Sequence, residues 1–323
     1  MLFLKFLKNI TLFKKKPATA TETTGHGATE TAGHIPGLRR MSDKAVRNHL
    51  REAEVRPRRP VITDPSTETL VSEANPCQNG GTYVVSNATC ICVFGFTGQL
   101  CERRYYDCSE AYLMGERVAG HITPLVIQPL TSPSPFTVSC YLDWGGFTFI
   151  EKRMGGACPD VDFNVTWAEL KHFIGDVECS YWLGLEHIHQ LTQQNTYMLD
   201  MYITSHNGFG GHALYSDFSL DSEGQGYKFN YNVYVRHGYP ADDGFAYGSG
   251  NDVNGFDFST LDRPDPDECV RGGAAWWYGS SCPEVNLHMP MQTGGIANPA
   301  TWVNVGTEIE VTTLMFQLST TWP

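Results

Sequence analysis

Hydrophobic and polar positions mark off a polar first quarter of the chain. Met1–Phe13 is apolar but interrupted by two lysines, and residues 14–75 are polar and rich in Thr, Ala, Pro and Arg. Such a composition buries too little apolar surface to offset the entropy lost on folding. Ser42–Val55 has the pattern of one short helix, which the prolines within residues 56–60 end. The pattern therefore predicts a largely disordered segment over residues 1–75.

From residue 107 onward, short runs rich in Val, Tyr, Phe and Thr alternate with clusters of Gly, Asn and Asp. Three such runs predict β-strands: Phe136–Leu142, Phe147–Arg153 and Tyr197–Thr204. One helix is signalled by Thr166-Trp-Ala-Glu169, a capping box in which the hydroxyl and the carboxylate each satisfy a backbone N–H. Gly175 is expected to end that helix.

Composition and charge add two constraints. With 41% hydrophobic residues, 32 Gly and 7 Trp, the chain suits a compact, loop-rich protein that contains β-structure. Residues 1–60 hold 13 Lys/Arg against 5 Asp/Glu, a net charge of +8, while residues 61–323 hold 10 against 30, a net charge of −20. The acidic body would repel phosphates, which argues against a nucleic-acid partner. Cations and basic surfaces are better partners for the acidic body, although an acidic surface often serves solubility alone.

Ten cysteines lie beyond the polar tail: Cys77, Cys90, Cys92, Cys101, Cys108, Cys140, Cys158, Cys179, Cys269 and Cys282. An even number confined to the folded region indicates five disulfides and an oxidising compartment. Zinc ligation is the competing interpretation. The close pair Cys90 and Cys92 has no second pair at zinc-ligand spacing, which disfavours zinc.

The apolar start does not have the layout of a secretion signal, because the lysines at 14–16 follow the apolar run instead of preceding it. Thirteen residues are too few to span a bilayer as a helix, and no other apolar stretch of about 18 residues occurs. A peripheral membrane anchor is the alternative. We expect an incomplete start and an extracellular protein.

A small cysteine-dense unit follows the tail. Residues 77–102 read CQNGGTYVVSNATCICVFGFTGQLCE, which resembles the later part of an EGF-like domain. Members of that family carry six cysteines, but Tyr83 stands at the third position and no cysteine precedes Cys77. The resemblance implies a β-hairpin module over residues 76–102 that acts as a spacer or weak protein contact and binds no calcium. It also implies the pairs Cys77–Cys90 and Cys92–Cys101.

The rest of the chain carries a set of spaced landmarks: Asp107-Cys108, Trp144-Gly-Gly-Phe-Thr148, Trp182–Thr192, Phe258–Asp262 and Trp276-Trp277-Tyr278 before Cys282. Together they make residues 107–318 resemble the fibrinogen C-terminal domain of ficolins, tachylectins, angiopoietins and tenascins. The resemblance implies an α+β fold, with an antiparallel sheet, short helices and a loop-rich C-terminal subdomain. It also implies the bridges Cys108–Cys140 and Cys269–Cys282. Cys158 and Cys179 are additional to the family pattern, and we predict that they pair.

The resemblance further implies a calcium site in the C-terminal subdomain. Family members use two Asp side chains two residues apart, and Asp265 and Asp267 have that spacing, with Asp262 nearby. Oxygen ligands of this kind suit a hard cation. However, the run to Cys269 is shorter than usual and is interrupted by prolines. A rigid acidic surface loop is the alternative.

A ligand pocket beside that site is also implied. Trp276, Trp277, Tyr278 and Cys282 are the candidate residues, since aromatic walls with a few polar groups suit a sugar or an acetyl group. Pro283 replaces the His that often follows the last cysteine. The alternative is that at least one Trp belongs to the core.

Other chemistry is sparse. Asn87-Ala-Thr and Asn164-Val-Thr are glycosylation sequons. The chain has no Gly-rich phosphate loop and no Gly-x-Ser-x-Gly elbow, so we do not expect an enzyme. Glu186-His-Ile-His189 offers metal-ligating side chains, but it coincides with a structural run of the family.

Two functions follow from these resemblances. The first is a secreted lectin of innate-immune type that binds glycans or acetylated ligands, with or without calcium. The alternative is a matrix adhesion or receptor-ligand signalling protein that uses the same domain for protein contact. No coiled coil or collagen stalk is visible in the sequence, which leaves the oligomeric state open.

Overall fold

The computed structural model describes residues 75–236, 238, 241–246, 252–279, 282–283, 285–291, 299–304 and 307–320. The chain divides into two units, 1–68 and 69–323, and every described residue lies in the second unit. The predicted disorder of residues 1–75 and the helix at Ser42–Val55 therefore fall outside the described residues, apart from Asn75.

The cysteine-dense unit is a two-stranded hairpin. Strand β1 (Thr82–Val84) pairs antiparallel with β2 (Thr89–Ile91). Gly81 is required because a Cβ there would lie 2.8 Å from the sulfur of Cys101. Beyond the hairpin, Thr97 and Arg103 exchange two backbone hydrogen bonds, at 2.9 and 3.2 Å, which close the second half of this unit.

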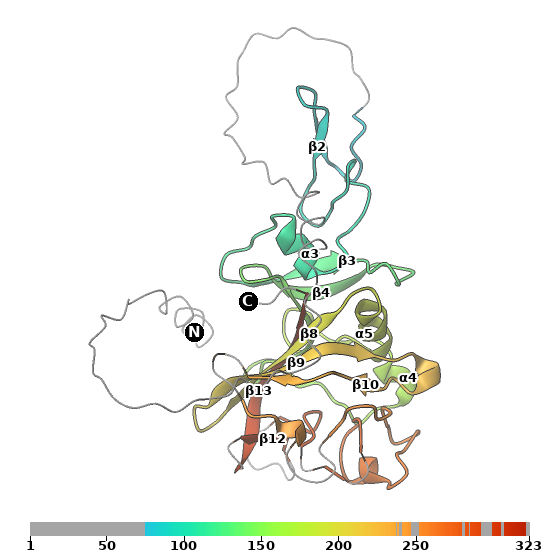
Figure 1. The fold of residues 1–323 in the computed structure, drawn as a ribbon, viewed down its shortest axis with the longest axis vertical. Coiled ribbons are helices and arrows are strands. Elements are labelled where there is room, and N and C mark those ends of the chain that lie inside the picture. The colour runs from blue at the N-terminus through green and yellow to red at the C-terminus, as the bar shows by residue number, and fades with distance from the viewer. Residues whose placement is uncertain are drawn as a thin grey trace, which may run out of the picture. The chain divides into compact units, whose positions relative to one another are not determined.

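The large domain is built on one antiparallel sheet in the order β10-β9-β8-β13-β5-β4-β3 (Figure 1). Its main strands are β3 (Ile122–Ile127), β4 (Phe136–Tyr141), β5 (Phe147–Arg153), β8 (Tyr197–Ser205), β9 (Gly210–Leu220) and β13 (Thr307–Ser319). The shorter strands are β6 (Ile174–Gly175), β7 (Tyr181–Trp182), β10 (Phe229–Asn230), β11 (Tyr234–Val235) and β12 (Thr301–Asn304). The three predicted strands correspond to β4, β5 and β8.

Strand β13 lies in the middle of this sheet, between β8 and β5. β13 pairs with β5 on one side and with β8 on the other, and all of these pairings are antiparallel. Leu314 and Leu318 of β13 are fully buried, as are Leu199 and Ile203 of β8. The core is therefore assembled from segments far apart in the sequence.

Three short helices accompany the sheet: α3 (Cys108–Leu113), α4 (Trp167–Leu170) and α5 (Leu185–Thr192). Single turns of 3₁₀-helix follow at η1 (Glu223–Gln225), η2 (Gly244–Ala246) and η3 (Cys269–Gly272). Leu185, Ile188 and Leu191 bury one face of α5, which contacts β9. Thr166 and Glu169 form the expected capping box at the start of α4.

The predicted end of α4 is wrong. The helix ends at Leu170, and Gly175 lies in β6, where its φ is 103°. A Cβ at this position would collide with the carbonyl oxygen of Ser180 on the neighbouring chain segment. Gly175 is therefore needed for the close approach of β6 to β7 and does not cap the helix.

Five disulfides cross-link the described residues, and they join the same pairs that the sequence predicts: Cys77–Cys90, Cys92–Cys101, Cys108–Cys140, Cys158–Cys179 and Cys269–Cys282. Cys108 and Cys140 are fully buried, whereas Cys158 and Cys179 are only half-buried. The Cys158–Cys179 bridge ties the loop after β5 to the loop before β7.

Candidate functional site

The aromatic residues expected to wall a ligand pocket belong to the core. Trp276, Trp277 and Tyr278 are 0%, 2% and 5% exposed. The Trp277 indole donates to the carbonyl of Tyr227 at 2.8 Å, and the Tyr278 hydroxyl donates to the carbonyl of Ala274 at 2.5 Å. Cys282 lies at the surface in its bridge to Cys269. The structure therefore does not assemble these four residues into an open aromatic cavity.

In the acidic loop, the carboxylates of Asp262 and Asp265 accept hydrogen bonds from backbone N–H groups. Asp265 is 4% exposed, and its carboxylate accepts from the N–H groups of Cys269 and Val270 at 2.9 and 3.0 Å. Those contacts anchor η3. Asp262 accepts from Thr260 and from the N–H of Trp167 at the start of α4.

These contacts bear on the calcium prediction. Although burial alone would raise the pKa of Asp262, the hydrogen bonds from Thr260 and Trp167 outweigh it and hold that pKa below its usual range. Asp267 is exposed. Among the described residues, no group of three or more His, Cys, Asp or Glu side chains is close enough to hold a metal ion. The side chains therefore do not fit a carboxylate cage, and calcium binding stays a prediction.

Behind this loop lies a buried pair of ionisable groups that sequence reasoning missed. The Nε2 atom of His288 is 3.3 Å from a carboxylate oxygen of Glu151, and both side chains are fully buried. The other ring nitrogen, Nδ1, is 2.8 Å from the carbonyl of Ala275. A carbonyl only accepts, so Nδ1 carries a hydrogen. The contact between Nε2 and Glu151 is close but lacks hydrogen-bond geometry, and neither Glu151 oxygen has a hydrogen-bond partner among the described residues.

The imidazole of His288 is enclosed by aromatic rings. It stacks on Phe163 with ring centroids 3.8 Å apart and an interplanar angle of 12°. Trp182 and Trp276 meet it edge-on at 5.2 and 4.7 Å. His288 therefore joins β5, through Glu151, to the aromatic core of the C-terminal subdomain.

A second charged residue of β5 holds the same loops. Arg153 is fully buried and forms a two-pronged ion pair with Asp160 at 2.6 and 2.7 Å. It also donates to the carbonyls of Leu287 and Met289 at 2.5 and 2.9 Å. Burial alone would raise the pKa of Asp160, but the hydrogen bonds and charge of Arg153 outweigh it and hold that pKa below its usual range.

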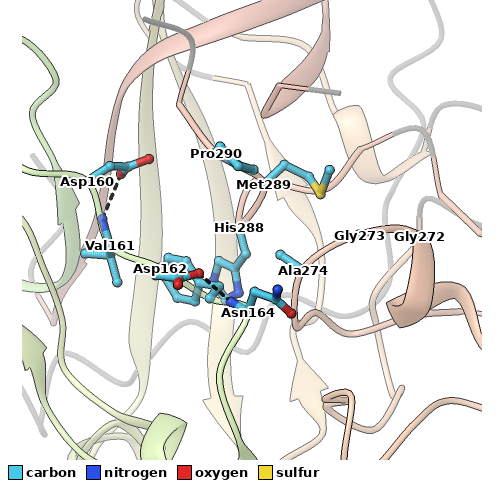
Figure 2. A pocket seen from close by; sticks show the side chains of 11 residues that line it. Asp160, Val161, Asp162, Asn164, Gly272, Gly273, Ala274, His288, Met289 and Pro290 are labelled. Atoms are coloured by element: carbon cyan, nitrogen blue, oxygen red, sulfur yellow. Dashed lines mark hydrogen bonds between the residues drawn. The ribbon is translucent and has the colours of Figure 1, made fainter. Parts of the chain in front are cut away.

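The anchored loops enclose a pocket of about 420 Å³ (Figure 2). It is lined by residues 160–164, 272–274 and 288–290. Phe163 and His288 form its buried floor, and the sulfur of Met289 lies over Gly273, where a Cβ would come within 3.3 Å of it. This pocket, and not the predicted aromatic one, is the concave feature that the structure describes here.

The two sequons lie at the surface. Asn87 is exposed in the turn between β1 and β2, and its side chain accepts from the Thr89 hydroxyl at 2.7 Å. Asn164 is exposed at the rim of the pocket, two residues before Thr166, the cap of α4. Its neighbours Phe163 and Trp167 are buried, so the exposed Asn164 side chain stands on a packed segment.

Comparison with known proteins identifies the large domain. The family described as "Fibrinogen beta and gamma chains, C-terminal globular domain" matches residues 104–313. The chain belongs to this family. The fibrinogen-type domain is mostly an antiparallel sheet with few short helices, as the sequence predicts. The EGF-like nature of the preceding hairpin stays a prediction.

Several relatives carry angiopoietin names. Human angiopoietin-related protein 1 is 34% identical over 188 residues, covering 55% of this chain and 35% of that protein. Human angiopoietin-2 is 33% identical over 196 residues, covering 57% and 36%. The chain thus spans about a third of the length of these relatives. Neither name is that of an enzyme.

Solved structures agree on the fold. The fibrinogen-like globe domain of human ANGPTL2 matches with a TM-score of 0.57 and 27% identity, over 66% of this chain and 98% of that one. The corresponding domain of human ANGPTL6 matches with a TM-score of 0.56 and 26% identity, over 68% and 96%. In the described part of the chain, no helix is long and apolar enough to cross a membrane.

Proposed function

We propose that this chain is an extracellular protein ligand whose fibrinogen-type domain contacts another protein, in receptor signalling or matrix adhesion. The observation that carries the proposal is the burial of Trp276, Trp277 and Tyr278. With these rings in the core, the C-terminal subdomain presents loop surface where a lectin would need an aromatic sugar cavity. The angiopoietin relatives support the same choice.

The surface that suits such a contact is the stretch 261–272. Leu261 is 44% exposed, and Arg271 is exposed in an ion pair with Glu268 at 2.8 Å. Arg263 lies flat over Trp167 at 3.9 Å. Arginine side chains are frequent anchors of protein interfaces, and the exposed Leu261 beside them adds apolar area that a contact can bury. Two prolines and the caps from Asp262 and Asp265 supply that rigidity.

Cell binding tests the class of partner. Fluorescent protein is applied to a panel of cultured cells and extracted matrix, after treatment of these surfaces with protease or with glycosidases. A protein partner predicts that binding is lost after protease and kept after glycosidase. The same protein is applied to a glycan array with and without chelator, where we expect no binding. Binding to acetylated sugars on the array, or loss of cell binding after glycosidase alone, would refute the proposal.

Matched variants test the surface. Leu261→Asp should weaken binding at least about tenfold, because excluding a leucine from a contact loses about 1.5 kcal/mol or more. Leu130→Asp is the control, since Leu130 is 67% exposed in the loop between β3 and β4. Equal effects of the two variants would show that residues 261–272 are not the contact surface.

A further inference from the structure

The rim of the pocket at residues 160–164, 272–274 and 288–290 carries a glycosylation sequon. Asn164-Val165-Thr166 fits the acceptor pattern, and its middle residue is not proline. Five disulfides indicate that the chain matures in an oxidising compartment, and secreted chains meet the glycosylation machinery on that route. The sequon and the pocket have to be considered together, because Asn164 is itself a lining residue.

The geometry leaves the acceptor nitrogen of Asn164 free. The side chain is exposed and makes no hydrogen bond with any described residue, while its backbone N–H donates to Asp162 at 2.8 Å. That turn fixes the position of Asn164 at the pocket edge, as Figure 2 shows. Thr166, the third sequon residue, is also exposed and caps α4 through Glu169. A substituent on Asn164 would therefore begin at the mouth of the pocket.

The pocket is large enough to hold a sugar that Asn164 tethers to its rim, although its rings are too buried to give the open aromatic wall that a free sugar would need. Its volume of about 420 Å³ falls in the range of roughly 300–1,000 Å³ typical of small-molecule sites. Met289 and Pro290 offer apolar contacts, and the exposed carboxylate of Asp162 offers acceptors for hydroxyl groups. An apolar wall with a few polar groups also fits a free small ligand, so whatever covers the mouth decides whether such a ligand can enter.

We propose that Asn164 carries an N-linked oligosaccharide whose first sugars cover this pocket and close it to external ligands in the secreted protein. In the modification, Nδ2 of Asn164 attacks the anomeric carbon of a lipid-pyrophosphate-linked oligosaccharide. The new C–N bond replaces the C–O bond to the pyrophosphate. The lipid pyrophosphate leaves with the bonding electrons, and the amide gives up one proton. The proposal does not depend on the identity of the protein partner.

The oxidation rates of methionines measure whether sugars shield the pocket. Met289 is a half-buried wall of the pocket, Met291 is 3% exposed, and Met114 is 53% exposed on another part of the domain. The full chain is secreted from a eukaryotic host behind a foreign secretion signal and treated with dilute peroxide. Peptide mass spectrometry then measures the occupancy of Asn164 and the oxidation rate of each methionine. Met114 reports reagent activity and Met291 reports unfolding.

Four forms of the protein are compared. These are the native glycoform, the same protein trimmed enzymatically to one sugar per site, Asn164→Gln, and Asn87→Gln. Asn164→Gln should fold normally, since the Asn164 side chain makes no hydrogen bond with any described residue. We expect Met289 to oxidise at least threefold faster in Asn164→Gln than in the native glycoform, and at the native rate in Asn87→Gln. Met114 and Met291 should not change.

The trimmed form needs no substitution, so it tests the cover even if a variant misfolds. Protection of Met289 that survives trimming would assign the cover to the first sugar, and protection that is lost would assign it to the sugars linked directly to that one. Either result supports the proposal. An unmodified Asn164, or a Met289 rate that is the same in the native, trimmed and Asn164→Gln forms, would overturn it.

Discussion

The buried pair of Glu151 and His288 permits a quantitative test of how β5 holds the C-terminal subdomain. At 3.3 Å, two opposite charges attract by about 5 kcal/mol at an effective dielectric constant of about 20. Withdrawing the two ions from water costs several kcal/mol each, so the intact pair contributes little net stability. Removing one partner is different, because the other group remains buried with nothing to neutralise it. Removing one partner should therefore lower the free energy of unfolding by about 3–5 kcal/mol.

Two substitutions of Glu151 distinguish the loss of its contact with His288 from the loss of packed side-chain volume. Glu151→Ala should lower the free energy of unfolding by about 3–5 kcal/mol. Glu151→Gln keeps the shape, and its amide N–H can donate to the bare Nε2 of a neutral His288, so its loss should stay below about 1.5 kcal/mol. Glu178→Ala, on an exposed loop, is the control and should change stability by less than about 0.5 kcal/mol.

Chemical denaturation with the disulfides intact measures these differences by linear extrapolation. Two probes, tryptophan fluorescence and far-ultraviolet circular dichroism, should give coincident transitions before a single free energy is assigned. If Glu151→Ala lost less than about 1 kcal/mol, or if Glu151→Gln lost as much as Glu151→Ala, the pairing of Glu151 with His288 would be incorrect.

Three further predictions concern pH, a disulfide and the acidic loop. Burial opposes the charge of His212, but Asp200, 2.8 Å from its Nδ1, outweighs burial and raises the pKa of His212. The stability from this pair is therefore complete below about pH 6.5 and is lost as pH rises through the raised folded-state pKa. His212→Gln should lose stability relative to wild type at pH 6 and little at pH 9, and an equal loss at both would contradict the assignment. Replacing Cys158 and Cys179 together by Ala should lower the free energy of unfolding by about 3 kcal/mol, as expected for a bridge across 21 residues. Mild reductant should open this half-buried bridge before the buried Cys108–Cys140 bridge, and the reverse order would refute the prediction. Asp265→Asn should cost about 1–2 kcal/mol with or without calcium, because it breaks an anchor of η3. A saturable calcium-induced rise in melting temperature that Asp267→Asn abolishes would instead establish a calcium site.

The sequence predicted those features of the fold that depend on residues close together in the chain. The Thr166–Glu169 capping box formed because both partners are three residues apart, and β5 has the bounds Phe147–Arg153 that the sequence predicts. The length of α4 was not predictable in the same way, since its end depends on where β6 meets β7.

The candidate site depended on contacts between distant segments. The sequence does not distinguish Trp276 and Trp277 as pocket walls from core residues. Distant contacts decide it, because both rings meet His288 and the Trp277 indole donates to the carbonyl of Tyr227. The pair of Glu151 and His288 spans a still larger separation. One signal was present: Glu151-Lys152-Arg153 places three consecutive charges in a strand, and all three prove to be buried. Such a run in a central strand indicates internal polar partners, which are His288 for Glu151, the Val177 carbonyl for Lys152 and Asp160 for Arg153.

The place of β13 has a consequence for synthesis. A growing chain releases β5 and β8 long before it releases residues 307–319, which must fill the slot between them. Until then both strands keep unpaired backbone edges, and such edges recruit other chains. A chain cut before residue 307 would therefore lack β13 and leave β5 and β8 with unpaired edges that favour aggregation.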